Sequence, residues 1–403
     1  MPSPNASGES QLHSAHILSM FAGSQTPFCN HRMLYEILLL VSIVYFLLMV
    51  TFALAVSRAQ YPSDDSVRPS VSIIIAARNE EQNIRQCLES IAELTYPKSL
   101  LEVLVVDDRS TDGTQLMVRE FEGQYTHVKL LVSDPEEGQL RGKTNAVTKG
   151  IEASSGKILL FTDADCTVRS DWVEQTVKYY DEPTVGIVAG FTSLKSRGWF
   201  ESIQALDWFL LFSVAAAAIR LRFPVTAIGN NLSIRRKAYD AVGGYRQIPF
   251  SVTEDYALFH AITSRTTFKA KFPLDRTTLV ESNPCKSWGE LYRQKMRWFT
   301  GGRDMDLKSM PIFIVAYLLN LLLVGMMFLD GPQAFLIPLA LKIAADLFLI
   351  NPSLSRFKRW NLIPYFLQYQ LYYTLYVIFF PVLLLFGTRV LWKDRLFTET
   401  EPR

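Results

Sequence analysis

The chain has 403 residues, which suffices for one large domain with a membrane part or for two modest domains. It carries 41 Lys and Arg against 39 Asp and Glu, and this near balance gives no general attraction to nucleic acid. The four cysteines stand far apart without a CxxC pair, so the spacing indicates neither a zinc site nor a disulfide framework and favours reduced thiols.

The first predicted element is a membrane-spanning helix over residues 34–57. This stretch is apolar except for Glu36 and is longer than the about 20 residues needed to cross a bilayer. It begins too late and is too long to be the apolar part of a signal peptide. Residues 1–33 are polar without periodicity and are expected to form a disordered tail.

Residues 58–308 have the pattern of a soluble domain, and strand and helix patterns alternate over residues 69–165. The run Val71–Ala77 is continuously apolar, which is typical of a strand buried on both faces. A helix is expected over residues 80–94. Further strands are expected over 102–107, 128–132 and 158–162. This alternation predicts an α/β fold with a parallel, doubly wound sheet.

Polar residues follow three of these strands, at the edge where such sheets bind ligands. They are Arg78-Asn79-Glu80, Asp107-Asp108-Arg109 and Asp163-Ala164-Asp165. Each group alone is typical of a turn or a helix cap. Together the carboxylates would repel one another unless a divalent cation lay among them and bridged to phosphate oxygens. The chain has neither a GxGxxG nor a GxxxxGK[ST] motif, which argues against a dinucleotide fingerprint and a P-loop.

Two later segments carry further candidate residues. Thr253-Glu254-Asp255 opens a helix, where the acids serve as capping groups or place a general base in the cleft. A helix over residues 288–303 would place Gln294, Arg297 and Trp298 on one face. Arginine suits phosphate, and tryptophan suits either a sugar ring or the aromatic belt of a membrane interface.

The apolar segment 200–219 is long enough to suggest another membrane span. If it crossed the membrane, Asp165 and Asp255 would lie on opposite sides. A shared site needs both on one side, so we expect an interfacial helix.

Residues 309–388 are expected to form a membrane domain of two to three spans. Stretches 311–329 and 333–350 are separated by the turn signal Asp330-Gly331-Pro332. Stretch 361–387 contains two prolines and suits one span or a re-entrant hairpin. Lys342 and Asp346, four residues apart, are expected to pair and face other helices.

Basic residues set the expected orientation. Arg356, Lys358 and Arg359 link the second and third stretches, and residues 389–403 form a basic tail. The positive-inside rule places both in the cytoplasm, and with them the domain of residues 58–308. We therefore expect an integral membrane protein, in the inner membrane if it is bacterial, with its soluble domain in the cytoplasm.

As an ordered set, these motifs resemble the membrane-bound family 2 glycosyltransferases, which include cellulose, chitin and hyaluronan synthases and ceramide glucosyltransferase. The resemblance rests on residues 71–81, Asp107-Asp108, Asp163-Ala164-Asp165, Thr253-Glu254-Asp255 and Gln294-x-x-Arg297-Trp298, and it covers roughly residues 69–303. It implies a GT-A fold, Rossmann-like and doubly wound, and an inverting reaction. One departure is Arg109, where the family usually has glycine, which puts the nucleotide loop in doubt.

The resemblance also implies a role for each residue. Asp255 would be the catalytic base, and Asp163 and Asp165 would hold Mg²⁺ or Mn²⁺. Trp298 and Glu254 would contact the acceptor. The nucleotide-sugar would be bound by Asn79, Glu80, Asp107, Asp108, Lys143, Asp163, Gln294 and Arg297.

The implied function is transfer of one hexose, with glucose the favoured sugar, from a UDP-sugar to a hydroxylated membrane lipid such as a glycolipid, sphingolipid or hydroxycarotenoid. Three to four spans leave little room for a polymer channel. A processive polysaccharide synthase of the hyaluronan or poly-N-acetylglucosamine type remains an alternative, as does a non-catalytic nucleotide-binding membrane protein. A transporter would show paired repeats and more spans.

Overall fold

The computed structural model describes residues 27–58, 68–223, 225–302, 305, 307, 309–329, 332–383, 389–392 and 395–398, without the side chains of 27–30, 332–333, 389–392 and 395–398. Most of the expected N-terminal tail, the turn residues Asp330 and Gly331, and parts of the C-terminal tail lie outside the described residues. The first helix, α2 (Pro27–Ser57), begins earlier than expected. Its first turns are polar, and Arg32 and Glu36 form an exposed ion pair of 3.0 Å there.

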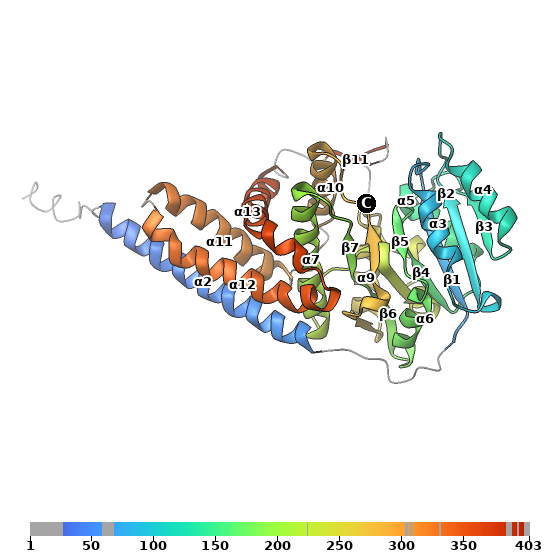
Figure 1. Cartoon of the computed structure of the whole chain (residues 1–403), viewed down its shortest axis with the longest axis horizontal. Helices are drawn as coiled ribbons and strands as arrows, with labels where there is room; N and C mark the ends of the chain where they lie inside the picture. The colour runs from blue at the N-terminus through green and yellow to red at the C-terminus, as the bar shows by residue number, and fades with distance from the viewer. Residues whose placement is uncertain are drawn as a thin grey trace, which may run out of the picture.

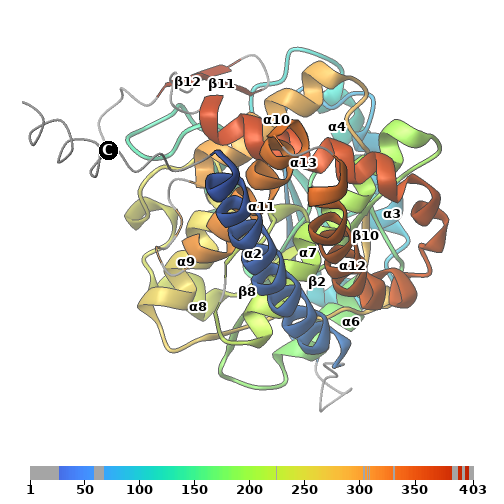
Figure 2. The ribbon, with the colours of Figure 1, turned by 90° about the vertical axis from the view of Figure 1, so that its left-hand side faces the viewer.

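Five helices of the described chain are long and apolar enough to cross a membrane: His31–Ser57, Trp199–Arg220, Met310–Leu329, Ala334–Phe357 and Trp360–Leu383. Helices α2, α11 (Met310–Leu329) and α12 (Pro332–Phe357) pack side by side and project from one side of the molecule (Figures 1 and 2). The described part of the stretch 361–387 forms a 3₁₀ turn, η7 (Trp360–Tyr365), followed by α13 (Phe366–Leu383).

The first half of the main sheet is parallel, as the sequence predicts. Strands β1 (Val71–Ala77), β2 (Leu101–Asp107), β3 (Val128–Val132) and β4 (Ile158–Phe161) stand in the order β3-β2-β1-β4. Their connecting helices are α3 (Ile84–Ala92), α4 (Thr114–Gln124) and α5 (Gly142–Ala153). Ala77 pairs with Asp107 in the parallel register, so β1 and β2 end at the same level.

The second half of the sheet, for which the sequence predicted no strands, is mixed. Strand β8 (Leu232–Arg235) is antiparallel to both β4 and β6 (Val185–Ala189), and β9 (Lys269–Lys271) extends the sheet beside β6. A smaller sheet joins β5 (Cys166–Val168), β10 (Val280–Ser282) and β7 (Thr192–Leu194). The remaining elements are α6 (Trp172–Val177), α8 (Arg236–Ala241), α9 (Glu254–Arg265), α10 (Trp288–Gly301), β11 (Arg389–Trp392), β12 (Arg395–Thr398) and short 3₁₀ turns.

Helix α7 (Trp199–Arg220) lies between the sheets and the apolar helices α2, α11 and α12 (Figure 1). Of the 18 consecutive residues of α7 that are most apolar, 89% are buried inside the protein. Phe191 of the β6–β7 link packs against Phe209 of α7 and Phe357 of α12, with ring centroids 4.9 and 4.4 Å away. A helix that is apolar on all sides is expected to be buried on all sides. The predicted interfacial helix is therefore a core helix, and little of its surface is left for lipid.

Candidate active site

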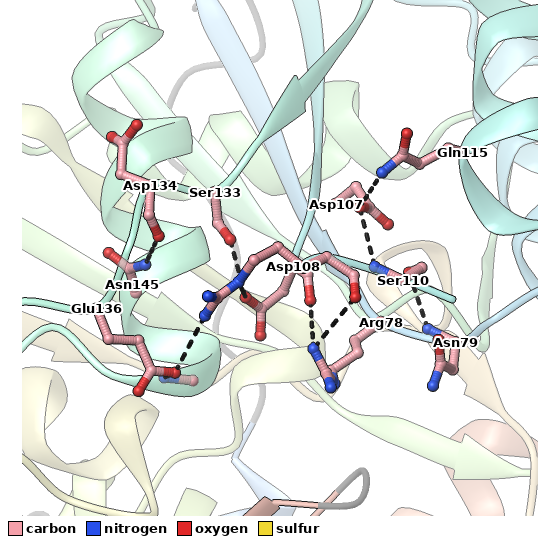
Figure 3. Close-up of polar contacts among 12 residues, drawn as sticks. Arg78, Asn79, Asp107, Asp108, Ser110, Gln115, Ser133, Asp134, Glu136 and Asn145 are labelled. Carbon is pink, nitrogen blue, oxygen red and sulfur yellow. Dashed lines mark hydrogen bonds and ion pairs between the residues drawn. The ribbon is translucent and has the colours of Figure 1, made fainter. Parts of the chain in front are cut away.

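The loops after β1 and β2 are joined to each other at the sheet edge (Figure 3). The backbone N–H of Asn79 donates to Ser110 Oγ at 3.0 Å, and Thr111 N–H donates to Asn79 Oδ1 at 2.9 Å. Asn79 and Arg109 both have left-handed backbones, with φ of 51° and 56°. Non-glycine residues rarely adopt this conformation, and such strained positions cluster at functional sites.

The carboxylates of Asp107 and Asp108 are fixed by this loop. Asp107 Oδ2 accepts from Ser110 N–H at 3.1 Å and from Gln115 Nε2 at 2.6 Å. Among the described residues, no hydrogen-bond donor reaches the buried Asp107 Oδ1. Asp108 Oδ1 accepts from Ser133 Oγ at 2.8 Å (Figure 3). A buried carboxylate oxygen without a partner is costly, so Asp107 offers an acceptor for an N–H or O–H of a bound ligand.

A small cavity lies beside the ends of β1 and β4, and its polar lining includes Lys143, Asp163, Glu254 and Asp255. Lys143 Nζ contacts Asp163 Oδ1 at 2.7 Å and Glu254 Oε1 at 3.0 Å. Burial lowers the pKa of Lys143, but the surrounding carboxylates raise it more, so its pKa lies above its ordinary value. The lysine is therefore a permanent positive charge in the cavity.

Asp255 is the second residue of α9, and its carboxylate accepts hydrogen bonds from two backbone N–H groups. Its Oδ2 accepts from Gly229 N–H at 2.6 Å, and its Oδ1 from Tyr256 N–H at 2.8 Å. Burial and the adjacent Glu254 raise the pKa of Asp255 to about 6, although Lys143 opposes this. A pKa near neutrality suits a general base.

The two aspartates predicted to bind metal lie on either side of Ala164. Asp163 lines the cavity, whereas Asp165 accepts from Ser282 Oγ of β10 at 3.3 Å. Burial, Asp163 and Glu80 raise the pKa of Asp165 to about 6. Across the described parts of the chain, no group of three or more His, Cys, Asp or Glu side chains forms a metal cluster. The described chain thus offers a divalent cation two carboxylate ligands, those of Asp163 and Asp165. Two ligands can hold such an ion only where the phosphates of a substrate and water supply the others.

The predicted site residues therefore form two neighbouring groups rather than one shared pocket. Asp107, Asp108 and Asn79 make up the first, and the cavity residues make up the second, while Asp108 and Asp165 do not line the cavity. Glu136 connects the groups, because it lies 3.6 Å from the Arg109 guanidinium and accepts from Gly142 N–H, next to Lys143, at 3.0 Å.

Helix α10 carries Gln294, Arg297 and Trp298, which do not line the cavity either. Trp298 packs against Trp208 of α7, with ring centroids 5.8 Å apart, and the Lys295 ammonium lies 4.1 Å from its ring centroid. The C-terminal end of α10 adjoins the N-terminal end of α9: a Cβ added to Gly301 would come within 2.2 Å of Thr253 Oγ1.

The sequence analysis missed a buried ion pair under this motif. Lys295 of α10 and Asp207 of α7 are 2% and 3% exposed and are hydrogen-bonded to each other. Tyr376 Oη of α13 donates to the other Asp207 oxygen at 2.7 Å. The available signal was Asp207, an acid in the interior of the apolar segment 200–219. The expected Lys342–Asp346 pair is confirmed at 3.0 Å, and Tyr45 and Gln370 also bond to Asp346.

Comparisons with known proteins show the family of the chain. The profile described as "Glycosyl transferase family 2" matches residues 72–255. Glycosyltransferase AglE of Haloferax volcanii is 30% identical over 232 residues, which cover 58% of this chain and 72% of that protein. A beta-monoglucosyldiacylglycerol synthase of a Nostoc species is 29% identical over 243 residues, 58% of this chain and 49% of the synthase.

Two further proteins are similar to this chain, a polysaccharide synthase in sequence and a solved mannosyltransferase in fold. The poly-beta-1,6-N-acetyl-D-glucosamine synthase of Staphylococcus epidermidis is 23% identical over 243 residues, 59% of this chain and 56% of the synthase. The match thus spans about half the length of these two synthases. The solved mannosyltransferase PcManGT from Pyrobaculum calidifontis shares the fold, with a TM-score of 0.57 at 22% identity, over 82% of this chain and 99% of that one. The predicted GT-A fold is confirmed, and the chain belongs to glycosyltransferase family 2, a family of sugar-transferring enzymes.

Proposed function

We propose that the chain transfers one hexose, with inversion, from a UDP-sugar to a hydroxyl group of a membrane lipid. The observation that carries this proposal is the cavity in which Asp255 faces Lys143, Glu254 and Asp163. It combines a buried carboxylate whose pKa is raised to about 6 with a lysine whose pKa is raised. A base opposite a cation is what single displacement at an anomeric carbon requires.

In the proposed step, Asp255 takes the proton of the acceptor hydroxyl. The resulting oxygen forms a bond to the anomeric carbon while the bond to the diphosphate breaks, and the electron pair leaves with the diphosphate. Lys143 and Arg297 stabilise the negative charge that develops on this leaving group. Glu254 keeps Lys143 in place through their 3.0 Å contact and lines the acceptor side with Trp298.

The nucleoside would lie over the first group of residues. Asp107 offers its buried Oδ1, which no described donor reaches, to an N–H of the base or a hydroxyl of the ribose. Asn79 and Asp108 support this position through their bonds to Thr111 and Ser133. Glu80 and Gln294 complete the proposed donor site toward the diphosphate.

Asp163 and Asp165 fit a divalent cation, Mg²⁺ or Mn²⁺. Their mutual repulsion contributes to the raised pKa of Asp165, and a bound cation would remove that cost. The PcManGT structure, which shares the fold, is a complex with GDP-mannose and Mn²⁺. Such an ion neutralises the diphosphate as it departs.

We expect activity to depend on this ion. Removing divalent metal with a chelator should abolish sugar transfer, and Mn²⁺ or Mg²⁺ should restore it. Asp165→Asn should raise the metal concentration for half-maximal activity by at least about tenfold. Ser282→Ala, which removes only a 3.3 Å hydrogen bond to Asp165, is the matched control with a smaller shift. Full activity in excess chelator would contradict the metal assignment.

The lipid acceptor is supported by the apolar helices beside the catalytic domain and by the similarity to a beta-monoglucosyldiacylglycerol synthase. The basic residues Arg356, Lys358 and Arg359 favour a cytoplasmic catalytic domain. The similarity to a poly-beta-1,6-N-acetyl-D-glucosamine synthase supports the second candidate, a polymer synthase.

Product analysis distinguishes the two candidates. Membranes that contain the chain are incubated with labelled UDP-glucose, UDP-galactose or UDP-N-acetylglucosamine and then extracted with organic solvent. We expect label in one glycolipid band on thin-layer chromatography, absent with Asp255→Asn. Label retained in a water-soluble polymer would replace the lipid proposal with the polymer one.

A further inference from the structure

Gln204 is a buried amide on the mostly apolar helix α7. Its side chain is 2% exposed, and it lies three residues before Asp207. Burying an amide costs free energy unless its polar atoms find hydrogen-bond partners. The partners of Gln204 therefore show which part of the chain it holds in place.

The main partner of Gln204 is the backbone of Cys285. Gln204 Oε1 accepts from Cys285 N–H at 2.9 Å, and Gln204 Nε2 donates to Cys285 O at 3.1 Å. Nε2 also donates to Phe200 O, one turn earlier on α7, at 3.1 Å. A side-chain amide carries both a donor and an acceptor, so it can bond to the N–H and the C=O of one residue at the same time. Cys285 is thereby fixed to α7.

The fixed residue lies just before helix α10. Ser287 is the N-cap of α10, and its Oγ accepts from Glu290 N–H at 3.2 Å. Glu290 Oε2 in turn accepts from Lys286 N–H at 2.7 Å. These reciprocal bonds tie the residues after Cys285 to the first turn of the helix. The contact between Gln204 and Cys285 therefore determines where α10 begins.

A second contact with α7 fixes α10 further along. Asp207 lies on the same face of α7 as Gln204, because residues three apart on a helix are neighbours, and it is hydrogen-bonded to Lys295. Lys295 directly follows Gln294 and lies two residues before Arg297. One face of α7 thus holds α10 at its start and beside its two proposed diphosphate residues.

In the other direction along the chain, the segment that Gln204 holds reaches the proposed metal site. Ser282, three residues before Cys285, donates from Oγ to Asp165 Oδ2 at 3.3 Å. The next residue, Asn283, donates from Nδ2 to Oδ1 of Asn83, the N-cap of α3, at 3.3 Å. This short segment therefore contacts Asp165 at one end and leads into α10 at the other.

We propose that Gln204 is a positioning residue for the diphosphate of the nucleotide-sugar. Asp165 would act on the diphosphate through a divalent cation, and Arg297 would act on it directly, so the separation of these two groups must match the ligand. Gln204 sets that separation through Cys285 and does not line the catalytic cavity. The inference rests on the proposed function, from which it takes the roles of Asp165 and Arg297.

The test compares the binding of UDP and of uridine to the purified full chain in detergent with Mn²⁺, by calorimetric titration. Gln204→Met keeps the length of the side chain and removes its hydrogen bonds. It should weaken UDP binding about tenfold, as loss of a supporting residue around a metal site does. Uridine binding should stay unchanged, because uridine has no diphosphate and would contact only the residues around Asp107.

The matched control is Ser213→Ala on the same helix. It removes a buried hydrogen bond of 2.8 Å between α7 and Ser353 of α12, and nothing in that bond leads to α10. Like Gln204→Met, it should lower the Tm, but it should leave both affinities at the wild-type values. Gln204→Glu is a second variant: it can still accept from Cys285 N–H but cannot donate to Cys285 O, so it should also weaken UDP binding.

The difference between the two ligands separates a positioning role from a structural one. Equal losses of UDP and uridine affinity in the Gln204 variants would overturn the inference, as would wild-type UDP affinity in either variant. A wild type that bound UDP no more tightly than uridine would also overturn it. Sugar transfer by the wild type tests the proposed function separately. If transfer occurs and the Gln204 variants keep UDP affinity, only this inference fails; if UDP and uridine behave as expected without transfer, only the proposed function fails.

Discussion

Replacing Asp255 by asparagine should lower kcat about 10²–10⁴-fold and leave UDP binding intact. The amide fits the same space and still accepts from the Gly229 N–H, 2.6 Å from Oδ2 in the wild type, but it cannot take a proton from the acceptor. The measurement pairs steady-state transfer with calorimetric titration of UDP. A variant that retained more than a tenth of the wild-type kcat would remove Asp255 from the role of base.

The pH profile gives a second measurement on the same residue. A base works in its ionised form, and the pKa of Asp255 is raised to about 6, so kcat/KM should fall as the pH drops through about 6. Glu254 is one cause of the raised pKa, and Glu254→Gln should therefore move this inflection to lower pH. An inflection that stayed in place would show that another group controls the profile.

The stability of the Asp255→Asn variant excludes unfolding as the cause of lost activity. A pKa raised above the unfolded value means that the folded protein holds the proton more tightly. The carboxyl group thus favours folding at low pH, and its ionised form costs stability once the pH rises through about 6. Asparagine removes that cost but can accept from only one of the Gly229 and Tyr256 N–H groups, so the two changes oppose each other and the Tm at neutral pH should stay close to that of the wild type.

The parallel half of the fold was predictable because each buried strand is a continuous apolar run. The strands Val71–Ala77 and Val128–Val132 have the predicted bounds, and the carboxylates after β2 and β4 follow from their ends. The mixed half was not predictable in the same way. Strand β8 has only four residues, and its antiparallel pairing with β4 and β6 depends on neighbours far away in the chain.

The candidate site, like the fold, was predictable only in part. Motif order was enough to nominate Asp163, Glu254 and Asp255, but the ion pairs of Lys143 with Asp163 and Glu254 come only from the fold. The segment 200–219 was misjudged because apolar length alone does not distinguish a helix facing lipid from one covered by protein. Phe191 and Phe357, which cover α7, are distant in sequence.

Breaking the buried pair between Lys295 and Asp207 should have the largest effect on stability. Asp207→Ala leaves the Lys295 ammonium buried without its partner, which costs about 3–5 kcal/mol. Tyr376→Phe removes one 2.7 Å hydrogen bond to Asp207 and should cost about 1 kcal/mol. The exposed pair of Arg246 and Glu152 is the control, and Glu152→Gln should leave the stability close to that of the wild type.

The double variant Asp207→Leu/Lys295→Met tests which interaction causes the loss of stability in Asp207→Ala. It removes both charges and keeps apolar volume between α7 and α10, so it should recover most of the lost stability in detergent unfolding experiments. If the penalty comes from the unpaired ammonium, the double variant unfolds at a higher temperature than Asp207→Ala. If it is as unstable as the single variant, the loss comes from the packing around Trp298, and the ion pair contributes little.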